Sequence, residues 1–161
     1  MEELSKVLDD LIECMSSKGL TLGFAESLTG GGISSSVVSV PGVSSFFQGA
    51  IVSYSNEVKI NVLGVPSEVI SSVGSVSSEC AEFMAEGASR VLGADVAVSA
   101  TGIAGPDGGS SEKPVGLVYM SAFCKGHRKT CRFVFEGDRQ QIRDQSIIEA
   151  LRLAREISEY G

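Results

Sequence analysis

Apolar residues recur along the chain with two different periods, and the changes between them predict helices and strands. From Glu3 to Ser17 one stripe has helical spacing: Leu4, Val7, Leu8, Leu11, Ile12 and Met15. This stripe predicts a surface helix that covers a sheet and ends at Gly19.

Three short apolar runs predict buried strands, at 21–25, 49–55 and 95–101. Helical patterns separate them, at 31–40, from a cap at Asn56 to Gly64, from Pro66, and from a serine cap at 77 or 78 to Leu92. Each later strand therefore follows a helical crossover, which favours parallel pairing.

The last third of the chain has the pattern of a hairpin followed by a helix. Residues 115–124 and 128–136 flank a turn that we place at Gly126-His127, and the second segment alternates as an edge strand does. Asp138 is the expected cap of the final helix. The whole order, α-β-α-β-α-α-β-β-β-α, predicts a single domain over 1–161: a three-layer α/β/α sandwich with a mixed, mostly parallel sheet of about five strands.

Composition excludes several function classes. The formal net charge of −7 argues against a nucleic-acid partner, which needs clustered cations. No apolar run reaches 18 residues, so no membrane span is expected, and the acidic start does not resemble a signal peptide, which implies the cytoplasm.

The cysteines and the single histidine suggest no metal site. Cys14, Cys80, Cys124 and Cys131 lie far apart without CxxC spacing, and His127 cannot complete a Cys/His set. With the turn at Gly126-His127, Cys124 lies opposite Lys129, so its sulfur is out of register with that of Cys131 and no disulfide is expected.

The stretch 23–32, Gly-Phe-Ala-Glu-Ser-Leu-Thr-Gly-Gly-Gly, is the strongest candidate for chemistry. A predicted strand ends there in a carboxylate and the hydroxyl of Ser27, and a glycine-rich turn leads into a helix. Such a turn can hold an anion and carry a nucleophile, but lacks the patterns of a dinucleotide site or a P-loop. The alternative is a strand-to-helix corner whose small residues serve close packing only.

A Ser-His-Asp triad is not expected, because His127 is the only histidine and lies in a hairpin turn. Lys59 follows a strand end and is the alternative base for Ser27. Lowering its pKa from 10.4 to 7–8 requires about 4 kcal/mol of differential destabilisation of the ammonium, from burial or from a cation such as Arg139 or Arg143. The competing interpretation is a solvated lysine near Glu57.

Two further segments carry possible chemistry. Ser110-Ser111-Glu112-Lys113 has the SxxK spacing of penicillin-recognising enzymes, but it lies in a predicted loop, where that spacing has no geometric meaning. The glycine-rich stretch 102–109, preceded by Thr101, can direct backbone N–H groups at an oxyanion, or can be an ordinary long surface loop.

Five sequence blocks, in order along nearly the whole chain, resemble one family. They are Ala25-Glu26-Ser27-x-Thr29-Gly30-Gly31, Tyr54-Ser55-Asn56-Glu57-x-Lys59, Thr101 to Gly109, Glu112-Lys113-Pro114-Val115-Gly116 and Gly137-Asp138-Arg139. The family is that of the CinA C-terminal domain, the PncC-type nicotinamide-nucleotide amidohydrolases. The resemblance implies hydrolysis of nicotinamide mononucleotide to nicotinic acid mononucleotide and ammonia, without metal or cofactor, on an α/β/α fold.

The resemblance also implies roles for individual residues. Ser27 is the expected nucleophile, Lys59 its base and Tyr54 a partner in their network; Arg139 is ranked before Arg143 as the assisting arginine. Leu28 stands where relatives often have cysteine, with no expected effect on the reaction. Expected substrate contacts are Glu26, Thr29, Gly30, Gly31, Asn56, Thr101, Gly102, Gly105, Gly108 and Arg143, with the phosphate near Thr29–Gly31 or an arginine.

A second function class stays open from the sequence. The same fold could serve as a non-catalytic nucleotide-binding module with a regulatory or interaction role. In either case a small nucleotide is the expected ligand, and the resemblance implies a homodimer or higher homo-oligomer.

Overall fold

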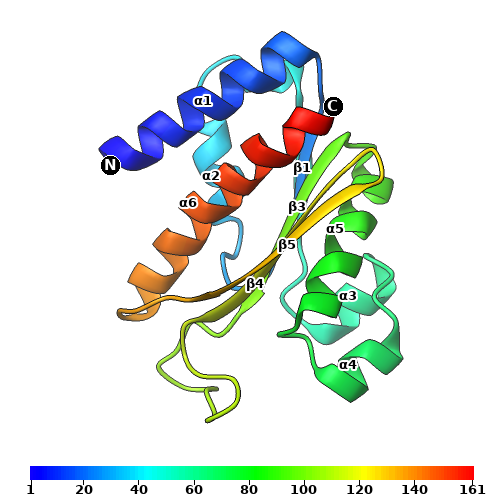
Figure 1. Ribbon diagram of the computed structural model, residues 1–161, viewed down its shortest axis with the longest axis vertical. Coiled ribbons are helices and arrows are strands. Elements are labelled where there is room, and N and C mark those ends of the chain that lie inside the picture. Colours follow the sequence, from blue (N-terminus) through cyan, green and yellow to red (C-terminus); the bar gives the residue numbers. More distant parts are fainter.

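Five strands form one sheet that is enclosed by helices on both sides (Figure 1). The computed structural model describes all residues, 1–161. The strands are β1 (Leu22–Glu26), β2 (Phe47–Val52), β3 (Val96–Gly102), β4 (Leu117–Cys124) and β5 (His127–Val134). Their order is β2-β1-β3-β4-β5, and only β4 runs against the others. The predicted mixed, mostly parallel sheet is confirmed.

The helices form the two outer layers of the sandwich (Figure 1). On one face lie α1 (Glu2–Lys18), α2 (Gly32–Val38) and α6 (Arg139–Ile157); on the other lie α3 (Asn56–Asn61), α4 (Ser67–Val73) and α5 (Ser78–Leu92). Two short 3-10 turns, Val43–Ser45 and Ser158–Tyr160, complete the element list. None of the helices is long and apolar enough to cross a membrane.

Each face of the sheet has its own apolar core. The larger one, under α1, α2 and α6, contains Leu11, Phe24 and Leu151, all fully buried. The smaller one, under α5, contains Ala25 and Met84. Because successive side chains of a strand point to opposite faces, Phe24 and Ala25 of β1 enter different cores. Glu26 and Ser27, which follow them, also point to opposite faces.

Three details differ from the sequence predictions. The second strand is Phe47–Val52, not 49–55, and it is half-exposed, because the chain crosses from β2 over β1 to β3 and leaves β2 at the edge. Ser55, not Asn56, caps α3, and its hydroxyl accepts a hydrogen bond from the Val58 amide.

The hairpin turn is centred on Lys125-Gly126, not on Gly126-His127. Both turn residues have positive φ, 49° and 82°, as a two-residue hairpin turn with the twist of its strands requires. Cys124 therefore lies opposite His127, and Cys131 lies opposite Met120. All four cysteines are free thiols.

Helix α5 approaches the segment that follows α3 very closely at Gly87. A Cβ atom built at this position collides with the carbonyl oxygen and other backbone atoms of Leu63, in the segment that follows α3. The absence of a side chain at Gly87 therefore sets how near α5 lies to the segment that carries Lys59.

Gly87→Ala should destabilise the protein by about 1–3 kcal/mol, although glycine to alanine inside a helix ordinarily stabilises it. The reason is that backbone atoms have to move to admit the methyl group. Denaturant unfolding gives the free energy of unfolding. Val91→Ala, at an exposed position of the same helix, is the control and should be neutral or stabilising. A more stable Gly87→Ala protein would contradict the proposed close approach.

Candidate active site

The carboxyl ends of β2, β1 and β3 meet at one edge of the sheet, and Ser27 lies there. Glu26, the last residue of β1, pairs with Val52 on one side and Ala100 on the other. Just beyond it, the Ser27 amide donates to the Ala100 carbonyl (3.1 Å). After β1 the chain forms β2 on one side of it, and later forms β3 on its other side. Ser27 is thus at a switch point, where open α/β sheets bind ligands.

The side chains of Ser27 and Lys59 meet at this edge. The distance from Lys59 Nζ to Ser27 Oγ is 3.1 Å. Helix α3 brings Lys59 here, because the chain leaves β2, passes Ser53 and Tyr54, and turns into the helix at the Ser55 cap. Ser27 is only 7% exposed and Lys59 only 2%. The sequence-predicted pair is therefore in hydrogen-bond contact and buried.

The Lys59 amine has no carboxylate partner. Its other contacts are the backbone carbonyls of Ser53 (2.7 Å) and Tyr54 (3.1 Å). Burial lowers the pKa of Lys59 from its usual value. A neutral amine fits this arrangement, since it has two N–H groups for the two carbonyls and one lone pair for the Ser27 hydroxyl. The alternative of a solvated lysine near Glu57 is wrong.

A thiol lies near the lysine in the smaller core. Cys80, on the first turn of α5, is fully buried, and burial raises its pKa to about 11. It is therefore uncharged at neutral pH and provides no counter-charge to Lys59. The uncharged Cys80 thiol therefore leaves Lys59 desolvated, and this desolvation lowers the pKa of the amine.

Glu26 points to the opposite face of the sheet, toward the start of α2. Its carboxylate accepts hydrogen bonds from the amides of Ile33 and Ser34 and from the hydroxyls of Thr29 and Ser34, at 2.7–3.0 Å. The side chain is fully buried. The anion-binding helix start that the sequence suggested is thus filled by the chain's own carboxylate.

This arrangement changes the expected roles of four residues. Glu26 and Thr29 are fully buried and bond to each other, so they shape the turn and do not face a ligand. Gly30 and Gly31 supply its left-handed backbone, with φ of 58° and 97°. The Ile33 and Ser34 amides at the start of α2 are already taken by the Glu26 carboxylate, and a substrate phosphate near Thr29–Gly31 stays a prediction.

The two candidate arginines, one helical turn apart on α6, do different things. The Arg143 guanidinium donates to the carbonyls of Leu28 (3.0 Å) and Thr29 (2.9 Å), so it holds the turn after Ser27. Arg139 donates to the Gly105 carbonyl (2.7 Å) and lines the pocket beside Ser27. Arg139 therefore lies at the pocket and Arg143 positions the turn, and the assisting role of Arg139 stays a prediction.

A small pocket of about 200 Å³ opens onto Ser27 and Lys59. It is lined by Ser27, Leu28, Tyr54, Lys59, Ser75, Val76, Thr101, Gly102, Ala104 and Arg139. Arg139 is the one arginine of this lining and no lining residue is acidic, in a protein whose formal net charge is −7. The pocket therefore suits an anionic ligand better than the average surface does.

Some predicted contacts fall elsewhere. Asn56 and Gly108 are exposed and lie outside the pocket lining, and Gly105 contributes its carbonyl to Arg139. The Tyr54 side chain lines the pocket but its hydroxyl makes no hydrogen bond; only its carbonyl joins the Lys59 network. The predicted Thr101 is buried, and its hydroxyl donates to the Ser75 carbonyl (2.9 Å).

The loop after β3 offers backbone donors. The Ala104 amide, in the pocket lining, donates to no acceptor within the chain, and neither does the Leu28 amide that follows the serine. The SxxK string lies outside the site: Ser110 and Lys113 close a turn of the loop, and the Lys113 amine reaches the Val73 carbonyl at the end of α4.

Sequence reasoning missed Ser53, Ser75, Val76 and Ala104. Ser53 is fully buried, and both its amide and its hydroxyl donate to the Glu26 carbonyl (2.7 and 3.2 Å). A serine ending an apolar run was the available signal. The pair Ser75-Val76 connects α4 to α5 and had no chemical signal of its own.

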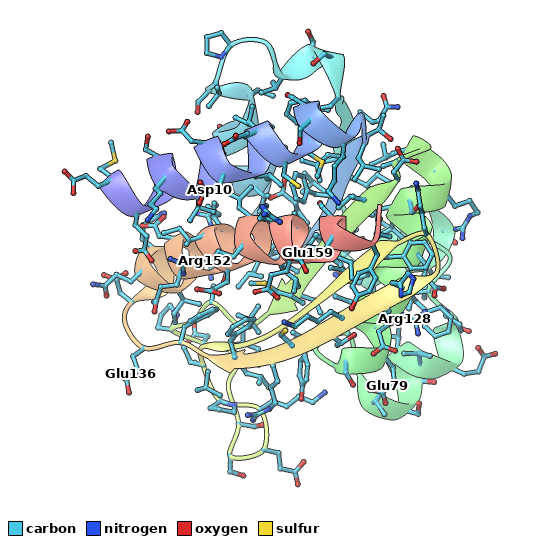
Figure 2. The ribbon with its side chains drawn as sticks, turned by 45° about the horizontal axis from the view of Figure 1, so that its top comes forward. Asp10, Glu79, Arg128, Glu136, Arg152 and Glu159 are labelled. Carbon is cyan, nitrogen blue, oxygen red and sulfur yellow. The ribbon has the colours of Figure 1, made fainter.

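Larger surface hollows occur away from this edge. Two of about 350 and 550 Å³ contain residues labelled in Figure 2: Asp10 and Arg152 between α1 and α6, and Arg128 and Glu159 beside the hairpin turn. Neither contains a nucleophile next to a base. No group of three or more His, Cys, Asp or Glu side chains is placed to hold a metal ion.

A buried serine bonded to a buried lysine, at the switch point of an α/β/α sandwich, defines the class of this site. Comparison with known proteins then gives the family. The sequence profile of the CinA C-terminal domain matches residues 4–158, so the chain belongs to that family. A CinA-like protein of Dictyoglomus thermophilum is 50% identical over 145 residues, which cover 90% of this chain and 35% of that protein. The chain spans about a third of the length of such curated relatives.

Solved structures of similar proteins share the whole fold. The competence/damage inducible protein CihA of Agrobacterium tumefaciens superimposes with a TM-score of 0.94 at 34% identity, over 96% of this chain and 95% of that one. A competence-damaged protein (CinA) superfamily protein of Klebsiella pneumoniae gives 0.93 at 28% identity, over 98% and 99%.

Glu26→Gln should destabilise the protein by about 1–3 kcal/mol, because the amide NH₂ faces N–H and O–H donors that the carboxylate accepts and leaves buried groups unsatisfied. Denaturant unfolding measures this. Glu68→Gln, an exposed change in the first turn of α4, is the control and should cost a few tenths of a kcal/mol at most. Equal effects of the two substitutions would refute the role of Glu26.

The lowered pKa of Lys59 has a consequence for stability. Between that pKa and 10.5 the unfolded chain binds more protons than the folded one, so the free energy of unfolding rises with pH. As the pH rises toward 10.5, wild type should gain stability relative to Lys59→Met. Lys6→Met, at an exposed position, should show no such trend. If the free energy of unfolding of wild type and of Lys59→Met changed in parallel with pH, burial would not lower the pKa of Lys59.

Proposed function

We propose that this domain is an amidohydrolase that converts nicotinamide mononucleotide to nicotinic acid mononucleotide and ammonia. The observation that carries the proposal is the contact between two buried side chains, Ser27 and Lys59, in which the amine has no acid to keep it protonated. Serine with a lysine base is an established alternative to serine with histidine. The substrate itself is suggested by the family resemblance, and the Arg139 guanidinium at the pocket is compatible with its phosphate.

The reaction begins when the Lys59 amine accepts the proton of Ser27 Oγ as the oxygen attacks the carboxamide carbon. In the tetrahedral intermediate, the amides of Leu28 and Ala104 are the available donors for the oxyanion. The C–N bond then breaks, and the Lys59 ammonium gives its proton to the leaving nitrogen, which departs as ammonia. The product of this half is an ester on Ser27.

The second half uses water in place of serine. Lys59 accepts a proton from the water that attacks the ester, and returns it to Ser27 Oγ as the acid leaves. No metal or cofactor takes part in this scheme. Arg143 contributes only by holding the turn, while Arg139 is a cation at the pocket. The homodimer and the cytoplasmic location remain predictions.

The test is ammonia release from nicotinamide mononucleotide. Ser27→Ala and Lys59→Met should each lower kcat by at least about 10³-fold, because the first removes the proposed nucleophile and the second removes its base. Ser110→Ala and Lys6→Met are matched controls, since they alter an exposed serine and an exposed lysine away from the pocket, and they should retain wild-type activity.

Two outcomes separate this proposal from a binding module. Undiminished turnover by Ser27→Ala would refute the mechanism. Thermal stabilisation of wild type by the nucleotide, without any ammonia release, would instead favour the non-catalytic nucleotide-binding function.

A further inference from the structure

Tyr54 combines a fixed backbone with an uncovered side chain. Its carbonyl accepts a hydrogen bond from Lys59, and the neighbouring Ser53 and Ser55 are held by the end of β1 and the start of α3. Tyr54 is nevertheless 63% exposed, although it is one of the residues that line the pocket. The residue is thus anchored at the pocket by its backbone, and its ring has a free surface.

The phenol hydroxyl has no partner in the site. The Ser27 hydroxyl and the Lys59 amine complete their contacts without it. What Tyr54 presents to a ligand is therefore an aromatic face and not a proton-transfer group. Such a face offers stacking area to flat rings and attracts cations through its quadrupole.

The size of the pocket determines where a ligand must contact this ring. Its volume, about 200 Å³, is below the roughly 300–1,000 Å³ typical of a site that encloses a small ligand. It can admit a carboxamide and part of its ring, and the remainder of a nucleotide then lies across the mouth. Tyr54 and Arg139 are the large side chains exposed there.

Resting on the proposed function, we propose that the Tyr54 ring stacks against the pyridinium ring of the substrate and sets specificity for a positively charged aromatic amide. The amide then points to Ser27. The positive ring charge near Lys59 also favours the neutral form of that amine, which the reaction requires. Tyr54 is a substrate-binding residue in this scheme, and its hydroxyl is dispensable.

Binding is measured by calorimetry in a Ser27→Ala background, so that no turnover occurs. Nicotinamide mononucleotide should bind the Tyr54→Phe variant within about twofold of the parent, and the Tyr54→Ala variant about tenfold more weakly. The reduced, uncharged dihydropyridine form of the nucleotide should lose most of this difference. Tyr160→Ala, which alters another exposed tyrosine outside the pocket, is the control and should leave affinity unchanged.

Several results would overturn the proposal. Equal binding by parent and Tyr54→Ala excludes a ring contact, and a loss in Tyr54→Phe as large as in Tyr54→Ala assigns the role to the hydroxyl. A change of oligomeric state in Tyr54→Ala on size-exclusion chromatography assigns the ring to a contact between copies. If wild type releases ammonia but Tyr54→Ala binds normally, only this proposal fails; if Tyr54→Ala weakens binding and wild type is inactive, only the proposed function fails.

Discussion

An amino group buried without a carboxylate is the constraint on which the rest of the site depends. Lys59 satisfies its hydrogen bonds with two carbonyls and one hydroxyl, all from neutral groups. The two carbonyls lie within reach because the chain turns from β2 into α3 in a few residues, so the lysine folds back over its own helix start. A carboxylate at this place would favour the ammonium and oppose the lowering of the Lys59 pKa that burial causes.

The alternation of side chains along β1 keeps the charges of the site apart. Glu26 and Ser27 are neighbours in sequence, but they face opposite sides of the sheet, the carboxylate toward α2 and the hydroxyl toward α3. The buried carboxylate is compensated there by helix amides and hydroxyls. A negative charge one residue from the nucleophile thus stabilises the turn without acting as a counter-ion to the lysine.

The sheet and the layers could be predicted from apolar periodicity and from the order of the elements. The Ser27–Lys59 pair was implied by the family resemblance, because spacing alone offered Lys59 only as one candidate base beside the alternative of a solvated lysine. Reasoning from the sequence dismissed the SxxK string correctly, because its spacing requires a helix. It could not find the role of Glu26, since a helix start attracts an anion whether that anion comes from a ligand or from the chain. Nor could spacing tell Arg139 from Arg143, which share one side of α6 and differ in what lies opposite them. Ser75 and Val76 reach the pocket through the packing of α4 and α5, which local patterns do not encode.

The hold of Arg143 on the turn after Ser27 joins positions that are 114 and 115 residues apart. During synthesis Ser27 and Lys59 are both made long before α6. The carbonyls of Leu28 and Thr29 can therefore accept hydrogen bonds from Arg143 only after most of the domain has been synthesised. Contacts of such long sequence separation form late, because loop closure must come first. The turn that carries the nucleophile therefore gains its last two side-chain contacts only when α6 has packed onto the sheet.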